Sequence, residues 1–128
     1  MKKKINLNLI VTAIFTAIIT MVCMNVINFY LFDKQVKKDL RNTAQTLQET
    51  GVFNKSAKIP DISVENMRIT WIDTDGTVLY DNENDETVLE NHLNRPEVKE
   101  AISNGEGDSD RQSATMDTKT YYHAILLD

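Results

Sequence analysis

Cysteine is almost absent from this sequence, because Cys23 is the only one among 128 residues. It lies inside an apolar run, so the rest of the chain has neither a disulfide nor a cysteine-ligated metal site. Packing alone must therefore hold any folded domain together. Charge is absent too, over the 28 consecutive positions from Ile5 to Phe32.

This uncharged stretch directly follows three consecutive lysines that begin at residue 2. About 20 helical residues cross the roughly 30 Å hydrocarbon layer of a membrane, so the stretch is long enough to span one. Positively charged flanks stay on the cytoplasmic side. We therefore expect a cytoplasmic tail at 1–4, a transmembrane helix at 5–32 in the lipid bilayer of the cell membrane, and an extracytoplasmic part at 33–128.

Two cleaved signals are the alternatives to a permanent anchor. A secretory signal has a shorter apolar region, about 7 to 15 residues, and ends at a small-x-small site, which residues 22–32 lack. A lipoprotein signal needs small residues just before its cysteine, whereas Met21 and Val22 precede Cys23. The sequence therefore favours an uncleaved anchor.

Positive charge is scarce in the remainder of the chain. From residue 60 to the end, sixteen acidic residues face five basic ones, a net charge of −11. This sign, together with the expected compartment, excludes nucleic acid as a partner. The 96 residues beyond the apolar run suffice for one small domain.

Residues 33–51 are predicted to continue the helix as a membrane-proximal segment. Apolar or small positions recur there at spacings of four, three and four residues: Val36, Leu40, Thr43 and Leu47. This spacing predicts either a coiled coil between two copies or an amphipathic helix that lies on its own domain. Gly51 suits the position that follows the end of a helix.

Alternating apolar residues from Met67 to Trp71 predict a strand with one buried face. Asp75 and Gly76 then favour a two-residue hairpin turn of type I′, in which both central residues have positive φ. Residues 77–80 are the expected return strand. The sequence therefore predicts a β-hairpin here.

Asn94 and Glu97 have the spacing of a helix-capping box, with Pro96 in the first turn. The predicted helix is short and ends at Gly105. His92, just before it, lacks the acidic neighbour of a phosphorylated histidine and is expected to be a capping or surface residue.

Two more strands are expected near the end of the chain. Residues 109–115 are polar and resemble an edge strand, and residues 116–119 form a turn. Residues 120–127 are apolar on both faces, so they are expected well inside a sheet.

Three segments carry a resemblance to a known family: residues 68–81, residues 90–102 and residues 111–115. The most specific motif is Asn91-His92-x-x-Arg95-Pro96-Glu97. With the preceding anchor and helix, the chain resembles the N-terminal part of a bacterial sensor histidine kinase of the phosphate-response type. The resemblance implies an α+β fold: a PAS-like extracytoplasmic domain of the Cache (PDC) type at residues 52–128, with an antiparallel sheet flanked by helices.

The resemblance also implies a fifth strand that inserts in the middle of the sheet, after the strand that ends near residue 127. This chain lacks it, so we expect a truncated, incompletely closed domain of marginal stability, with two unpaired strand edges.

The implied function is signal input: the outer domain detects a stimulus and relays it through the membrane helix of a homodimer. A cognate response regulator, ATP and Mg²⁺ would engage only kinase domains that lie outside this chain, which itself shows no catalytic motif and needs no cofactor. The alternatives are a stand-alone single-pass membrane interaction protein and the sensor region of a chemoreceptor.

In PAS-like domains the ligand lies between the sheet and its flanking loops. The candidate ligand-binding residues are Arg95, Arg111, Tyr122 and His123. Arginine suits a carboxylate or phosphate because its guanidinium pairs with two oxygens at once. In the alternative interpretation Arg111 pairs with a neighbouring acid, and the aromatic residues belong to the core.

A cluster of acidic residues follows the predicted hairpin: Asp81, Glu83, Asp85 and Glu86. Carboxylate oxygens are the ligands of Ca²⁺ and Mg²⁺, so these residues are metal candidates. A divalent site needs converging geometry, which a run of charges does not show. The sequence favours a solvated loop that leads into a helical turn.

Overall fold

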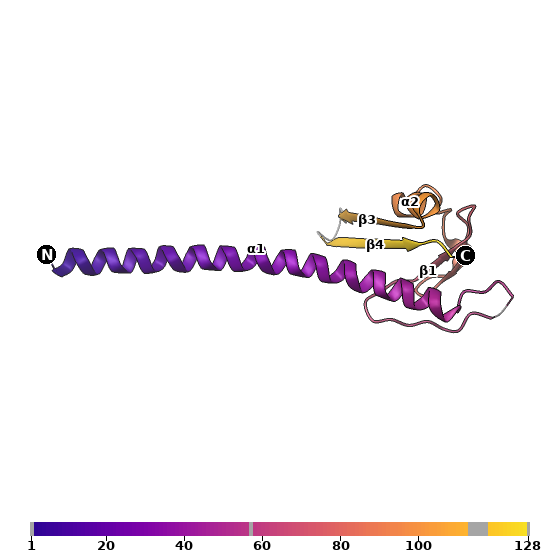
Figure 1. Cartoon of the computed structure of the whole chain (residues 1–128), viewed down its shortest axis with the longest axis horizontal. Helices are drawn as coiled ribbons and strands as arrows, with labels where there is room; N and C mark the ends of the chain where they lie inside the picture. The colour runs from indigo at the N-terminus through magenta and orange to yellow at the C-terminus, as the bar shows by residue number, and fades with distance from the viewer. Residues whose placement is uncertain (1, 57, 113–117, 128) are drawn as a thin grey trace. The chain divides into compact units, whose positions relative to one another are not determined.

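The structure is a computed structural model that describes residues 2–56, 58–112 and 118–127. It separates into two compact units, one up to Val36 and the other from Lys37 onward. Helix α1 (Lys2–Thr50) runs through both units, and all other elements belong to the second (Figure 1). The chain therefore has the predicted α+β class, a long N-terminal helix followed by small antiparallel sheets.

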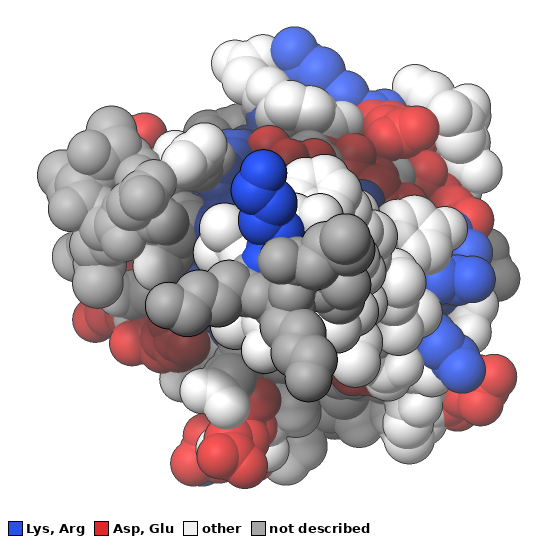
Figure 2. Space-filling view, turned by 90° about the vertical axis from the view of Figure 1, so that its left-hand side faces the viewer, with Lys and Arg blue, Asp and Glu red and all other residues white. Residues whose placement is uncertain are grey.

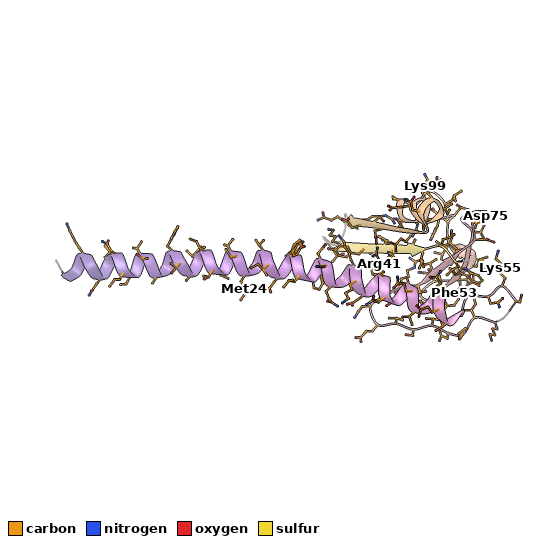
Figure 3. All side chains as sticks on the ribbon, viewed as in Figure 1. Met24, Arg41, Phe53, Lys55, Asp75 and Lys99 are labelled. Carbon is orange, nitrogen blue, oxygen red and sulfur yellow. The ribbon has the colours of Figure 1, made fainter. Side chains whose placement is uncertain are left out.

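The first unit is an apolar helical segment whose side chains are exposed. Met24, for example, is 62% exposed (Figure 3). Mean hydropathy reaches 2.3 over eighteen residues of α1. By length and composition, α1 can therefore cross a membrane.

The polar side chains of this segment bond to the helix itself. The hydroxyl groups of Thr12 and Thr16 donate to the carbonyl groups of Asn8 and Thr12, at 2.7 and 3.1 Å. The amide of Asn25 donates to the carbonyl of Met21 at 2.8 Å. These bonds lower the cost of placing polar groups in hydrocarbon.

In the second unit, one stripe of α1 is half-buried against its own domain. Leu40, Thr43 and Leu47 lie on this stripe, whereas residues 41, 42, 45 and 46 are exposed. Of the two interpretations of the heptad-like spacing, the structure therefore shows the amphipathic helix on its own domain. The helix ends at Thr50, and Gly51 follows it with φ +63°.

The predicted hairpin is present as β1 (Thr70–Ile72) and β2 (Val78–Asp81), which pair antiparallel. The prediction of a two-residue type I′ turn between them is wrong, however. Gly76 donates to the carbonyl of Asp73 at 2.8 Å and has φ +89°, and Asp75 does not share its positive φ. This is the pattern of a three-residue loop that ends in a left-handed glycine.

The side chains of the loop explain its length. The Asp73 carboxylate accepts from the backbone N–H of Thr74, and the Asp75 carboxylate accepts from that of Thr77, both at 2.8 Å. Such local bonds stabilise a turn in which only the glycine needs positive φ. After β2, a 3₁₀ helix η1 (Glu86–Val88) follows.

Helix α2 (Pro96–Asn104) begins with proline, as predicted, and ends at Gly105, which has φ +90° and donates to the carbonyl of Ala101 at 2.8 Å. The prediction of a capping box at the start of this helix is wrong. Arg95 occupies the capping position and makes no side-chain capping bond. The carboxylate of Glu97, which is itself buried, bonds instead to Ser109 and Arg111, because a charge-assisted ion pair outweighs one capping bond.

Strands β3 (Glu106–Gln112) and β4 (Lys119–Ile125) pair antiparallel over their full length, from Glu106 opposite Ile125 to Gln112 opposite Lys119. Strand β3 thus starts earlier than predicted. The expected continuation to residue 115 and the first two residues of the turn at 116–119 fall on residues 113–117, outside the described part of the chain. The last residue of that predicted turn, Lys119, is the first residue of β4.

Strand β4 was expected well inside a sheet, but β3 is its one strand partner in the described part of the chain, and β4 is mostly half-buried. Among the described residues, the strands form two separate two-stranded sheets, β1–β2 and β3–β4. The apolar core of the described residues is correspondingly small: Val78, Val98 and Ala101.

Surface charges of opposite sign lie close together. Arg41 of α1 contacts Glu106 of β3 at 3.1 Å, and Lys119 contacts Asp110 at 3.2 Å. In Figure 2, acidic and basic side chains are interspersed over the described part of the face in view. Exposed pairs of this kind contribute little stability, but they offset part of the acidic charge.

Candidate functional site: a cavity between two sheet edges

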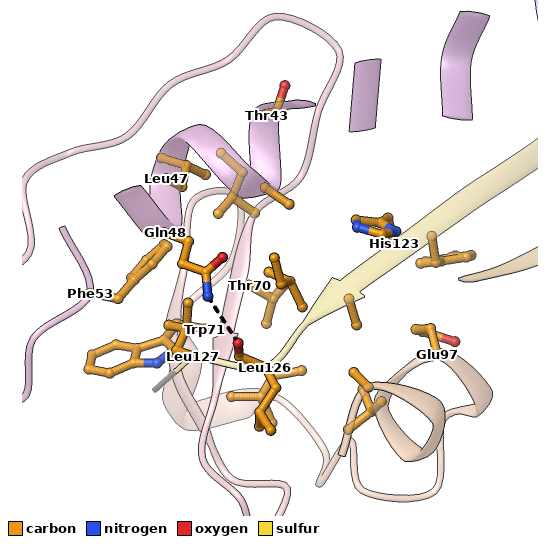
Figure 4. A pocket seen from close by; sticks show the side chains of 18 of the residues that line it. Thr43, Leu47, Gln48, Phe53, Thr70, Trp71, Glu97, His123, Leu126 and Leu127 are labelled. Carbon is orange, nitrogen blue, oxygen red and sulfur yellow. Dashed lines mark hydrogen bonds between the residues drawn. The ribbon is translucent and has the colours of Figure 1, made fainter. Parts of the chain in front are cut away.

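The second unit contains a cavity of about 820 Å³ bounded by the C-terminal part of α1, by β1, by α2 and by β4 (Figure 4). This volume is in the range of small-molecule sites. Gln48 of α1 spans one end, where its side-chain amide donates to the carbonyl of Leu126 at 3.2 Å. The cavity therefore brings together segments that lie more than 80 residues apart in the sequence.

Apolar side chains from both helices line the cavity. Leu40, Ala44 and Leu47 come from α1, and Val98 and Ala101 come from α2. Val98 and Ala101 are buried, but the three residues from α1 are only half-buried, so apolar surface is left facing the cavity. An occupant with apolar groups would remove that surface from water, which is favourable by about 25 cal/mol per Å².

Two strand edges also border the cavity. Strand β1 pairs only with β2 and strand β4 only with β3, so each has an edge without a strand partner in the described residues. No Cα of β1 lies within 8 Å of a Cα of β4. Paired strands are about 4.8 Å apart, so β1 and β4 are not neighbours in one sheet.

Arg111, one of the four predicted ligand residues, is already engaged. Its guanidinium bonds to the carboxylate of Glu97 and lies 4.1 Å from the centre of the Tyr122 ring. Ser109 donates to the same carboxylate at 2.6 Å, and Glu97 is 4% exposed. Burial opposes ionisation of Glu97, but the hydrogen bonds from Ser109 and Arg111 outweigh it and lower the pKa. The structure therefore shows the alternative interpretation, in which Arg111 pairs with an acid.

Arg95 is the second of the predicted ligand-binding residues, and it lines the cavity. Its guanidinium makes no hydrogen bond or ion pair with any described residue, and Glu97 attracts it only at longer range. Burial and the nearby charge of Arg111 lower the pKa of Arg95. An anion in the cavity would relieve both effects, because it would supply hydrogen bonds and opposite charge.

Tyr122 and His123 of β4 complete the predicted set and also line the cavity. The His123 side chain is 2% exposed, and its Nδ1 lies 2.8 Å from the Asp108 carboxylate. Its Nε2 is buried and has no hydrogen-bond partner among the described residues. A buried polar atom without a partner is costly, so Nε2 is a point at which a bound group would stabilise the site.

The acidic cluster does not converge. The Asp81 side chain has no exposed surface and accepts from Arg68 at 2.8 Å and from Thr70 at 2.7 Å. Asp85 accepts from Thr87 at the start of η1, whereas Glu83 and Glu86 are exposed. The described residues contain no group of three histidine, cysteine or acidic side chains placed to hold a metal ion. The structure shows a loop that leads into a helical turn, which is the interpretation that the sequence favoured for this cluster.

His92 is the residue that sequence reasoning misplaced. It was expected at the surface or as a cap, but it is 2% exposed. Its backbone N–H donates to the carbonyl of Gly76 at 2.8 Å, which fastens the segment before α2 to the hairpin turn. Burial, then the charge of Arg95, lowers the pKa of His92. The polar neighbours Asn91 and Asn94 gave no signal of burial.

Comparison with known proteins identifies no relative of this chain. No protein-family model matches it, and no curated protein or solved structure matches it either. The sequence resemblance and the geometry of the cavity are therefore the two grounds for a functional proposal.

Proposed function

We propose that this chain is the sensor-input part of a membrane sensor histidine kinase. In this proposal the second unit is a PAS-like extracytoplasmic domain, a stimulus occupies the cavity, and α1 relays the signal. One observation carries the proposal: α1, which contains the apolar segment, also forms a wall of the cavity through Leu40, Ala44 and Leu47.

The relay follows from this shared helix. An occupant that contacts α1 in one arrangement better than in another shifts the population toward that arrangement. A shift or rotation of the helix then passes the change along the chain. Moving an equilibrium from 1:99 to 99:1 needs about 5.5 kcal/mol of differential affinity. A homodimer is the proposed acting form, and the response regulator, ATP and Mg²⁺ engage only the implied kinase domains.

Cysteine labelling of intact cells tests the proposed topology. With Cys23→Ser as background, Glu86→Cys places a thiol on exposed η1 and Lys4→Cys places one before the apolar run. A membrane-impermeant maleimide should label the Glu86→Cys chain in intact cells, and the Lys4→Cys chain only after permeabilisation. Labelling in the opposite order would contradict the proposal.

The same background tests the dimer. Disulfide cross-linking should be strong at exposed α1 positions such as Asn42→Cys and Gln45→Cys, which lie on one face. Leu40→Cys and Leu47→Cys face the cavity and serve as matched controls. Uniform absence of cross-linking along α1 in native membranes would contradict a relay across a dimer.

A further inference from the structure

The imidazole ring of His92 is fully buried, and its two nitrogen atoms are unsatisfied. The residue is 2% exposed, and neither Nδ1 nor Nε2 has a hydrogen-bond partner among the described residues. The ring also lies apart from the cavity, because His92 is not among the described residues that line it. A buried polar atom without a partner costs free energy, so the placement of this ring calls for a physical explanation.

The segment before α2 is fastened to the hairpin loop at this ring. The backbone N–H of His92 donates to the carbonyl of Gly76 at 2.8 Å, and the side-chain amide of Asn91 donates to the carbonyl of Asp75 at 2.9 Å. The same segment leads into α2, because the N–H of Arg95 donates to the carbonyl of His92 at 3.1 Å. The buried ring therefore lies where the hairpin meets the start of α2.

The surroundings of the ring oppose a positive charge on it. Burial does so most strongly, and the guanidinium groups of Arg95 and Arg68 repel a proton on His92. The backbone carbonyl groups of Glu90 and Asn91 favour a charged ring without hydrogen-bonding to it, and they do not outweigh burial. Together these effects lower the pKa of His92, so the buried ring is mainly neutral at pH 7.

Carboxylates on the elements around this contact are engaged by other groups. They bond as follows: Asp81 of β2 with Arg68, Glu97 of α2 with Arg111, Asp73 and Asp75 of the hairpin loop with Lys55 and the N–H of Thr77, and Asp85 before η1 with Thr87. Glu90, two residues before the ring, is exposed. A protonated His92 would therefore be a buried charge without a counter-ion among the described residues, and moving the ring into water would remove that cost.

We propose that the contact between His92 and the hairpin loop is a pH-sensitive switch, in which mild acidification releases the segment before α2 from the hairpin. In the closed arrangement the neutral ring is buried. In the open arrangement the charged ring is in water, and the bonds to Gly76 and Asp75 are broken.

The direction of the switch depends on where the ring binds a proton more tightly. A solvated histidine has a pKa near 6.5, and the pKa of His92 in the closed arrangement is lower. The closed arrangement is therefore fully favoured above pH 6.5, and it loses stability as the pH falls from 6.5 toward the lower value. This inference holds whether or not α1 relays a signal, so the two proposals fail separately.

Hydrogen exchange of the full chain in detergent micelles, followed by NMR at pH 7.5 and pH 5.5, tests the switch. After correction for the intrinsic pH dependence of exchange, protection of the His92 N–H should fall severalfold at pH 5.5, and by at most about tenfold. Protection of the Gly105 N–H, at the far end of α2, should stay the same. Asp81, whose pKa is about 2, is ionised at both pH values. Unchanged protection at His92, or an equal fall at Gly105, would overturn the proposal.

The two histidines of the chain provide a matched pair of variants. His92→Gln keeps a polar side chain of similar size that does not titrate, and it should abolish the pH dependence of protection at position 92. His123→Gln makes the same change at the ring that lies beside Asp108, and it should leave the response at His92 intact. A response that persists in His92→Gln, or that disappears in His123→Gln, would overturn the proposal.

Titration of the ring itself decides the matter if His92→Gln does not fold. The ring-proton resonance of His92 in the unaltered chain, assigned by comparison with His123→Gln, should titrate with a midpoint below pH 6.5. A midpoint at or above pH 6.5 would overturn the proposal, because the open arrangement would then bind the proton no more tightly than the closed one.

Discussion

Asp81 ends β2 with a carboxylate that has no exposed surface, although the chain around it is acidic. Burial opposes its ionisation, but bonds from Thr70, Arg68 and the backbone N–H groups of Glu83 and Asn84 outweigh burial and lower the pKa to about 2. A carboxylate whose pKa is lower in the folded than in the unfolded chain stabilises the fold at any pH above its unfolded pKa, which is near 3.8 for Asp81. This stabilisation is lost as the pH falls through the pKa of the folded chain.

Asp81→Asn should therefore reduce the free energy of unfolding at pH 7 by about 2 kcal/mol. Between pH 4 and pH 2 the unaltered chain should lose that stability, whereas the variant should change less. Urea unfolding followed by near-ultraviolet circular dichroism measures both. Asp110→Asn, at an exposed pair with Lys119, is the control and should cost less than about 0.5 kcal/mol. Equal losses in the two variants would contradict the assignment.

At the residue scale, the sequence indicated which kinds of residue line the cavity better than it indicated which residues they pair with. Arginine near an aromatic strand suggested a binding site, and three of the four predicted residues do line the cavity. The pairing of Arg111 with Glu97 joins residues on different elements, so spacing alone could only offer it as an alternative. The burial of His92 depends on a backbone bond to Gly76, which no local pattern announces.

Gly76 fixes the hairpin loop at the scale of the element. It has φ +89°, and a Cβ on it would lie 2.3 Å from Asn91 Oδ1 and 2.6 Å from the backbone N of Leu93. The loop and the segment before α2 are therefore in contact at a position that only glycine fits.

Gly76→Ala should destabilise the chain by about 3 kcal/mol, because a left-handed backbone and a backbone clash add together. Gly51→Ala is the matched control. It also has positive φ, but nothing lies within 4 Å of its Cβ position, so it should cost about 1 kcal/mol. Thermal unfolding measures both, and equal costs would show that the contact with Asn91 and Leu93 is unimportant.

Elements were predictable where the signal was local. Alternation gave the hairpin, and Gly105 gave the end of α2. The loop type was wrong because the Asp73 and Asp75 side chains bond to the turn, and the capping box was wrong because Glu97 has partners on β3. In both places a side chain makes hydrogen bonds other than those that the motif assumes.

At the scale of the whole molecule, the apolar part of α1 is long and apolar enough to cross a membrane. Ile18→Asp with Ile19→Asp should prevent stable membrane insertion, since each aspartate near the centre of a span costs about 3 kcal/mol. Carbonate extraction of membranes should then release the variant. Thr46→Asp with Gln45→Asp changes exposed positions of the same helix and should leave the chain in the pellet. Release of both variants would contradict a spanning role for residues 5–32.

The coarse class followed from the order of patterns, because one long apolar helix preceded short alternating segments. The division of the strands into two sheets did not follow. Residues 120–127 are apolar enough for the middle of a sheet, yet β4 has a partner on one side only in the described chain. Hydrophobicity indicates that a strand will be covered, but it does not name the neighbour that covers it.

The single tryptophan of the chain lies on β1, beside the cavity, with its ring centre 5.5 Å from that of Phe53. Indole emission depends on the polarity around the ring. The protein thus contains a single tryptophan at the wall of the cavity, and the wavelength of its emission maximum reports, without any added dye, whether that space holds water or a bound molecule.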